Sequence, residues 1–173
     1  MKRTISLISL LLVCLCAHAQ DCFSVQDGHV IWQEVYETDL DSTSIVASLQ
    51  ASGKLTDIIN TPGGLSCTIA PHMPDYLGAG FSSMQVAMLL TRSDMMSHAL
   101  IQFREGRYRV TVSDISFHVT GIVTVPEFTT LIEDYLDRKG NFKNTFRSNH
   151  VDEVLDYDFN RIFELKDIEE EEW

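Results

Sequence analysis

The alternation of apolar and polar residues over positions 99–112, ALIQFREGRYRVTV, constrains the fold more strongly than any other pattern in the chain. A two-residue turn at Glu105-Gly106 would join two antiparallel strands into a hairpin. One face of the hairpin is then wholly apolar and carries Ala99, Ile101, Phe103, Tyr108, Val110 and Val112. The opposite face carries Gln102, Arg104, Arg107, Arg109 and Thr111. A slip of one residue would bury all three arginines, so the pattern predicts the register of the two strands.

The three arginines of this hairpin lie within six positions of a chain whose formal net charge is −12. Two interpretations stay open: a solvated sheet face, which is the usual role of surface charge, and a patch that binds an anionic partner. Arg104 and Arg107 would lie directly opposite each other, which is mildly destabilising in a sheet and is not explained by the first interpretation. The candidate binding face consists of Arg104, Arg107, Arg109 and Gln102.

The N-terminal residues have the three parts of a secretory signal peptide. Lys2 and Arg3 precede an apolar run over residues 5–15, and Ala17-His18-Ala19 forms an A-x-A cleavage site. We therefore expect cleavage after Ala19 and export to the periplasm, the cell envelope or the extracellular space. The run is shorter than the about 20 apolar residues that cross a bilayer, so we expect no transmembrane segment in the mature chain.

Cleavage would make the chain still more acidic. Two of the 13 basic residues leave with the signal peptide, so 11 basic residues remain against 25 acidic ones, a net charge of −14. A chain with this charge repels nucleic acid and anionic membranes as a whole, and we expect no nucleic-acid partner. Ten of the acidic residues lie between Asp152 and Glu172, so the C-terminal segment is the main source of negative charge.

Two cysteines, Cys22 and Cys67, follow the expected cleavage site. In an oxidising compartment they are candidates for one disulfide that would tie the mature N-terminus to an inner strand. The alternative is a pair of thiols in which Cys67 acts as a small core residue. The spacing alone does not decide between them.

The first half of the chain predicts strands at 29–38, 57–60 and 65–69, with the turn TPGG at 61–64 between the last two. Asp41 or Ser42 caps a helix that ends at Ser52, with Gly53 as its stop. Residues 71–97 have the composition of a loop, and MQVAMLL at 84–90 fits a buried strand or a helical turn. The hairpin alternation breaks after Ser113, where we expect a bulge or a strand end.

The second half predicts helices. Pro126 would begin a helix closed by Gly140, because Phe128, Leu131, Ile132, Tyr135 and Leu136 have helical spacing. A final helix starting at Ser148 or Asn149 would bury Val151, Val154, Leu155, Phe159, Ile162 and Phe163. We therefore expect a signal peptide (1–19), an α+β domain (20–140) and a C-terminal helix with an acidic tail (141–173).

Three stretches, WQEVYETD at 32–39, IINTPGGLSCTI at 58–69 and especially FREGRYRVTVSDI at 103–115, resemble a known family. Together with the signal peptide, they make the chain similar, over about residues 27–118, to the secreted Bacteroidetes family described as domain of unknown function 4468. The resemblance implies the TATA-binding-protein-like (TBP-like) fold, an α+β fold in which a curved antiparallel sheet carries helices on one face. The segment 71–97 and the final helix, here a C-terminal helical extension, depart from the family pattern.

The resemblance brings no catalytic residue, and the name of the fold does not imply DNA binding. The sequence has no G-x-S-x-G motif, and YLGAGF at 76–81 lacks the third glycine of a dinucleotide loop. The acids of DYDFN at 156–160 have the spacing of a calcium loop, but Arg161 stands at the glycine position, so a solvated helix face is the better interpretation. The histidines after the signal peptide show no zinc-ligand spacing; they are His29, His72, His98, His118 and His150.

Trp32 and Tyr36 share a strand face, where they would either pack in the core, the favoured interpretation, or stack on a sugar. We expect no metal, no cofactor and no enzymatic activity. The expected function is that of an interaction or ligand-binding module, with an envelope protein or an anionic glycan as partner. The acidic C-terminal helix would be a second contact surface.

Three other classes of function stay open. A hydrolase would have to assemble its site from dispersed Asp, Glu and His residues. A small-ligand carrier would need an apolar cavity between sheet and helices. A homo-oligomeric structural protein would pair the arginine hairpin with the acidic tail.

Overall fold

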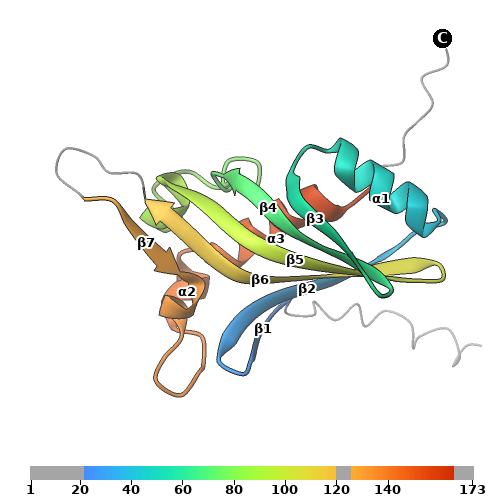
Figure 1. Cartoon of the computed structure of the whole chain (residues 1–173). Coiled ribbons are helices and arrows are strands. Elements are labelled where there is room, and N and C mark those ends of the chain that lie inside the picture. The colour runs from blue at the N-terminus through green and yellow to red at the C-terminus, as the bar shows by residue number, and fades with distance from the viewer. Residues whose placement is uncertain (1–21, 120–125, 166–173) are drawn as a thin grey trace, which may run out of the picture.

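One antiparallel sheet forms the centre of the molecule. The structure is a computed structural model of the 173-residue chain and describes residues 22–119 and 126–165. Within these residues the sheet has seven strands: β1 (Phe23–Gln26), β2 (His29–Glu37), β3 (Leu55–Thr61), β4 (Gly64–His72), β5 (Ser93–Arg104), β6 (Arg107–Val119) and β7 (Phe128–Leu131). The strand order is β1-β2-β6-β5-β4-β3, and β7 pairs with the far end of β6 (Figure 1).

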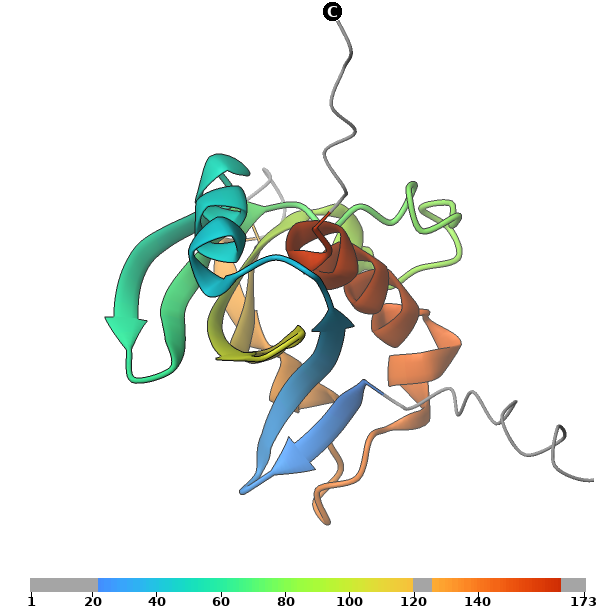
Figure 2. The ribbon, with the colours of Figure 1, turned by 90° about the vertical axis from the view of Figure 1, so that its right-hand side faces the viewer.

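The helices of the described residues are α1 (Ser42–Ala51), α2 (Asn144–Ser148) and α3 (Val151–Phe163), with 3-10 turns η1 (Met88–Thr91) and η2 (Ile132–Tyr135). The sheet is curved, and α1 and α3 lie together on one of its faces (Figure 2). None of these helices is long and apolar enough to cross a membrane. The expected signal peptide at 1–19 and the acidic run at 169–172 lie outside the described residues.

The register predicted for the β5–β6 hairpin is confirmed. Arg104 lies opposite Arg107, Phe103 opposite Tyr108 and Ala99 opposite Val112, around the turn at Glu105-Gly106. The apolar side chains between them face the helices and are buried, except for Phe103, which is half-buried near the turn. The predicted bulge is also present: the pairing shifts between Met96 and His98, opposite Asp114, whose φ is 53°. The bulge returns the side chains of Ile115 and Phe117 to the core, where both are fully buried.

The helix predicted at 42–52 is confirmed as α1. The Asp41 side chain accepts a hydrogen bond of 2.8 Å from the backbone N–H of Ser44, which caps the helix N-terminus. Ile45 and Leu49 are buried as expected. All six apolar residues expected to face inward from the final helix are buried in α3, in the same hydrophobic cluster as the sheet. That helix begins at Val151, two or three residues after the predicted start, because a separate short helix, α2, ends at Ser148.

The helix predicted at 126–140 is wrong. Residues Phe128–Leu131 form strand β7, and a 3-10 turn follows. Strand β6 extends beyond the end of β2, so without β7 the backbone of residues 116–119 would have β5 on one side and no partner on the other. The helical spacing of the apolar residues did not correspond to a buried helix face. Of these residues only Ile132 is fully buried, whereas Phe128 and Leu131 are exposed. The short edge strand β1 was not predicted from the sequence.

Helix α3 is fixed to the sheet by polar contacts as well as by apolar packing. Trp32 Nε1 donates a hydrogen bond of 2.8 Å to Asp156 Oδ1, and Tyr36 OH donates one of 2.8 Å to Asn160 Oδ1. These two hydrogen bonds connect β2 to α3 at two separate positions. Tyr108 OH donates a hydrogen bond of 2.6 Å to the carbonyl oxygen of Phe163, at the end of the helix. The DYDFN motif is therefore a helix segment that docks on the sheet and not a calcium loop.

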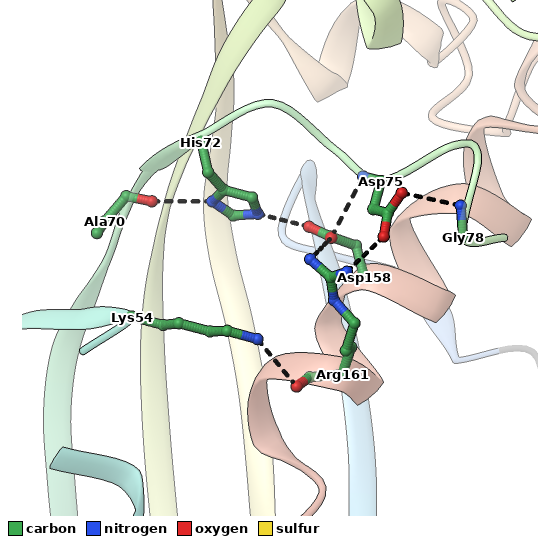
Figure 3. A network of polar contacts seen from close by, with 7 residues as sticks. All are labelled: Lys54, Ala70, His72, Asp75, Gly78, Asp158 and Arg161. Atoms are coloured by element: carbon green, nitrogen blue, oxygen red, sulfur yellow. Dashed lines mark hydrogen bonds and ion pairs between the residues drawn. The ribbon is translucent and has the colours of Figure 1, made fainter. Parts of the chain in front are cut away.

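The second acid of the same motif, Asp158, is fully buried and anchors a polar network (Figure 3). His72 Nε2 lies 2.5 Å from Asp158 Oδ2, and His72 Nδ1 lies 2.9 Å from the Ala70 carbonyl oxygen. Because both partners are acceptors, the two contacts are hydrogen bonds together only when the imidazole is protonated. Arg161 contacts both Asp158 and Asp75, and Asp75 in turn accepts a hydrogen bond from the Gly78 N–H.

The network raises the pKa of His72. Burial disfavours the charged imidazole, but the hydrogen bonds to Asp158 and Ala70 and the negative charge of Asp158 outweigh burial, and the pKa lies above its ordinary value of 6.5. The pair joins the end of β4 to α3, and Asp75 fixes the loop between them. The network is therefore a structural clamp.

The Tyr108 hydroxyl should contribute measurably to stability. Tyr108→Phe leaves the Phe163 carbonyl, an unpaired acceptor at a helix end, without its donor in the interior. We expect a loss of about 1–3 kcal/mol in the free energy of unfolding, measured by urea denaturation. Tyr157→Phe is the matched control, because Tyr157 is exposed, and it should change stability by less than about 0.5 kcal/mol. Equal effects of the two substitutions would contradict this role.

The His72–Asp158 pair should make stability depend on pH. Because folding raises the pKa of His72, the stabilisation is fully present below the unfolded-state pKa and is lost as the pH rises through the folded-state value. The difference in unfolding free energy between the wild-type protein and His72→Gln should therefore be larger near about pH 6 than near about pH 9. Urea titrations at both values measure it. A difference that is constant or grows with pH would show that His72 is not protonated in the clamp.

Candidate functional site

The candidate site lies at the turn end of the β5–β6 hairpin, on the sheet face opposite the helices. We call the side chains of Gln102, Arg104, Arg107 and Arg109 the arginine face. All four line one hollow of about 420 Å³, together with Val35 of β2 and with Pro62 and Gly63 of the β3–β4 turn. The structure therefore brings together all four residues that the sequence assigned to a binding face.

Gln102 holds one of the three guanidinium groups in place. Its Oε1 accepts hydrogen bonds from Arg109 Nε at 3.2 Å and from Arg109 Nη2 at 2.5 Å. The two residues are opposite each other across the β5–β6 ladder, so the contact needs no bending of the backbone. The amide is neutral, so Arg109 keeps its full positive charge and its Nη1 donors stay available to a ligand.

Arg104 and Arg107 are a like-charge pair directly opposite each other in the ladder. On the other side of β6, Glu37 is opposite Arg107 in register, but their charged groups do not form an ion pair. Across residues 22–119 and 126–165, no carboxylate lies within 4.0 Å of the charged nitrogens of Arg104, Arg107 or Arg109. The acidic chain thus leaves a local positive surface without compensation.

The backbone around the arginine face is firmly held. The Phe103 N–H donates to the Gly63 carbonyl at 3.0 Å, and the Thr38 N–H donates to the Gly106 carbonyl at 3.1 Å. Gly64 lies against the Ile101 backbone so closely that any Cβ would clash with the carbonyl oxygen. The hairpin turn and the β3–β4 turn are therefore fixed beside each other, and the hollow between them is pre-formed.

The candidate disulfide between Cys22 and Cys67 is not formed. Cys22 precedes the edge strand β1, and Cys67 lies on β4, which is four strand-to-strand steps away in the sheet, or roughly 19 Å. A disulfide needs Cα atoms within about 7 Å of each other. Instead, the Cys22 thiol donates to Glu34 Oε2 at 3.1 Å, and burial raises the pKa of the Cys67 thiol to about 11. Cys67 is thus the small core residue of the alternative interpretation.

The five histidines are dispersed, and four of them contact carboxylates. The contacts are His29 with Glu133, His72 with Asp158, His118 with Glu127 and His150 with Glu153. The fifth, His98, has Nε2 at 3.1 Å from Ser66 Oγ, an arrangement of nucleophile and base. In the part of the chain that the structure describes, no carboxylate orients its Nδ1, and no three His, Cys, Asp or Glu side chains gather around a common metal position.

Of the two aromatic residues that the sequence offered as a sugar platform, Trp32 is packed in the interior and Tyr36 is half-buried at its edge. Trp32 is fully buried against Phe159, with ring centroids 5.2 Å apart, and Tyr36 stacks on Tyr108 at 5.0 Å. Their polar atoms bind α3 residues, as described above. Sequence reasoning missed these contacts, because the partners in each pair are 124 positions apart in the sequence.

The comparisons with known proteins support the fold. No protein-family model and no curated protein sequence matches the chain. The structure is similar to that of a TBP-like protein from Parabacteroides distasonis, with a TM-score of 0.53 and 15% identity, over 83% of this chain and 96% of the other. It is also similar to a DUF4468 family protein from Bacteroides ovatus, with a TM-score of 0.46 and 12% identity, over 85% of this chain and 93% of the other.

The second of these proteins has the family designation that the sequence motifs indicated. The first carries the structural conclusion, because at this level of identity a similarity speaks for the fold and not for a function. The structural similarity to the first protein covers 83% of this chain, which is more than residues 27–118. The chain therefore has the TBP-like fold, an antiparallel sheet with helices packed on one face.

Proposed function

We propose that this chain is an exported, non-catalytic binding module whose arginine face recognises a carboxylate-bearing partner at the cell envelope. One observation carries the proposal: three arginines line a single hollow and none of them has a carboxylate partner among the described residues. The guanidinium group presents a planar fork of N–H donors that matches a carboxylate. Arg109, held by Gln102, would engage the first carboxylate with little loss of side-chain entropy.

The charge distribution supports an extended acidic partner over nucleic acid. The net charge of −12 opposes the approach of any polyanion, so attraction arises only within about 10 Å of the arginine face. A nucleic-acid duplex would have to approach along a large part of the acidic surface. A flexible acidic segment of an envelope protein or a uronic-acid glycan would touch the hollow alone.

The helix expected to form a second, acidic contact surface has few acids to offer. Asp156 binds Trp32, Asp158 is buried against His72, and Glu153 contacts His150. This observation moves the proposed interaction to the hairpin. A role for the acidic run at 169–172 stays a prediction, because it lies outside the described residues.

The Ser66–His98 pair is the feature nearest to a catalytic arrangement, and its surroundings favour binding over catalysis. Both residues are on strands β4 and β5, where their side chains face the open surface of the sheet. Neither lines the hollow of the arginine face or any of the four other main hollows of the described residues. A Ser–His pair without an orienting acid or a substrate pocket lacks two of the parts that an acyl-transfer enzyme needs.

Removing arginines from the hairpin should weaken binding to carboxylate polymers. The variant Arg104→Gln/Arg107→Gln should bind immobilised poly-glutamate or polygalacturonate at least about tenfold more weakly than the wild-type protein at low salt, a change of about 1.4 kcal/mol. The wild-type interaction should weaken as salt is added. Surface plasmon resonance measures both effects, and preference for one polymer identifies the partner as acidic protein or as glycan.

The matched control is Arg138→Gln/Lys139→Gln, which removes the same net charge from an exposed loop outside the site. It should retain wild-type affinity within about twofold. Equal weakening by the two double variants would reduce the effect to net charge. Failure of the wild-type protein to bind either polymer would contradict the proposed function.

A further inference from the structure

A second hollow, of about 890 Å³, lies at the opposite end of the β5–β6 ladder from the arginine face. Strand β5 has 12 residues, so the two sites are about 35 Å apart. Its lining residues come from η1 and the start of β5 on one side and from β7, η2 and α2 on the other. Figure 1 shows these elements at the same end of the sheet. Most of the lining residues lie in 71–97, for which the sequence left a strand or a helical turn open, and in 126–140, for which a helix was predicted. We call this hollow the apolar cleft.

Most of the exposed wall of the apolar cleft consists of hydrocarbon and thioether groups. They include Met73, Met88, Leu89, Val119, Phe128 and Tyr135. Met88 is 64% exposed, Met73 52% and Phe128 43%, so large apolar groups meet solvent on both sides of the opening. Methionine side chains are unbranched and adapt to flexible apolar ligands. The size and lining are those of a small-molecule site.

Two of the hydroxyl groups that line the cleft, both on the side of η1 and β5, are turned to the protein. Thr91 Oγ1 donates to the Met88 carbonyl at 2.9 Å, and Ser93 Oγ donates to the Leu89 carbonyl at 2.7 Å. These two groups have no donor left for a polar ligand. Together with the Met88 and Leu89 side chains, they make this wall of the cleft suitable for an aliphatic chain.

The charged groups of the cleft are two cations and two anions, Arg92 and Lys143 with Asp94 and Asp134. Lys143 Nζ donates to the backbone carbonyl of Asp134 at 2.7 Å, which fixes the ammonium group in the cleft. Among the described residues, none of these four side chains forms an ion pair. Charges of both signs, uncompensated and summing to zero, complement a head group that itself carries both signs.

We infer that the apolar cleft binds a zwitterionic single-chain amphiphile, with the aliphatic chain between Met88 and Phe128. The phosphate of a lysophospholipid head would meet Lys143 and Arg92, and its amine would meet the carboxylates of Asp94 and Asp134. The inference is independent of the arginine face, which lies on other residues. It gives the chain a second binding activity, for a single lipid molecule.

Isothermal titration calorimetry with lauroyl lysophosphatidylethanolamine, kept below its micellar concentration, tests the inference. We expect saturable binding at one site per chain. Laurate and dodecylamine, which have chains of the same length and heads of one sign, should each bind several-fold more weakly. Glycerophosphoethanolamine, which has the head alone, should not bind. Absence of saturable binding, or tighter binding of laurate or dodecylamine, would overturn the inference.

Two matched substitutions test whether the lysolipid binds in the apolar cleft. Met88→Gln puts an amide into the wall of the cleft and should weaken lysolipid binding on the order of tenfold. Met84→Gln is the same chemical change at a methionine that is 95% exposed outside the cleft, and it should leave binding unchanged. Equal effects of the two variants would overturn the assignment to the cleft. Lys143→Gln should reduce the preference for the zwitterion over dodecylamine, and an unchanged preference would overturn the head-group assignment.

Discussion

The register of the β5–β6 hairpin is the constraint on which the rest of the structure depends. It directs Tyr108, Val110 and Val112 to the face that receives α1 and α3, and it directs the arginines to the opposite face. A shift of one residue would bury three charges, whose desolvation no described acid could compensate. The bulge at Asp114 preserves the same division over the second half of β6. The β5–β6 pairing therefore determines both the core face and the arginine face of the hairpin.

On the helix side of this sheet, polar contacts determine the orientation of α3, and apolar packing adds to its stability. Apolar surfaces alone tolerate small rotations of a helix, whereas Trp32–Asp156, Tyr36–Asn160 and His72–Asp158 fix its axial position and its rotation at once. Each pair also satisfies a buried or half-buried polar atom that would otherwise be costly. On the other face, none of the three arginines has a carboxylate partner among the described residues, and Arg109 is held only by the neutral amide of Gln102. This contrast between satisfied and unsatisfied charge is the physical basis of the proposed function.

The sequence predicted those parts of the fold in which local pattern and tertiary environment agree. The hairpin, the helix capped by Asp41 and the buried stripe of α3 all have one apolar face, and each was correct. Strand β7 was mistaken for a helix because its formation depends on the unpaired edge of β6, which lies outside any local window. The four residues of the arginine face were found because a hairpin brings neighbours in sequence together. The apolar cleft was beyond reach, since its walls come from segments about 40 residues apart whose structures were not predicted.

The most direct test of the account is a nuclear magnetic resonance titration that follows the Nε–H signals of the arginine side chains as poly-glutamate is added. If the arginine face binds carboxylates, the signals of Arg104, Arg107 and Arg109 will move together and saturate, while those of Arg92 and Arg138 will stay in place. Saturating shifts of Arg92, with the hairpin signals unchanged, would place the anion-binding surface elsewhere. Small shifts of equal size at every arginine would show that the hairpin carries only solvated surface charge, and this result would contradict the central claim.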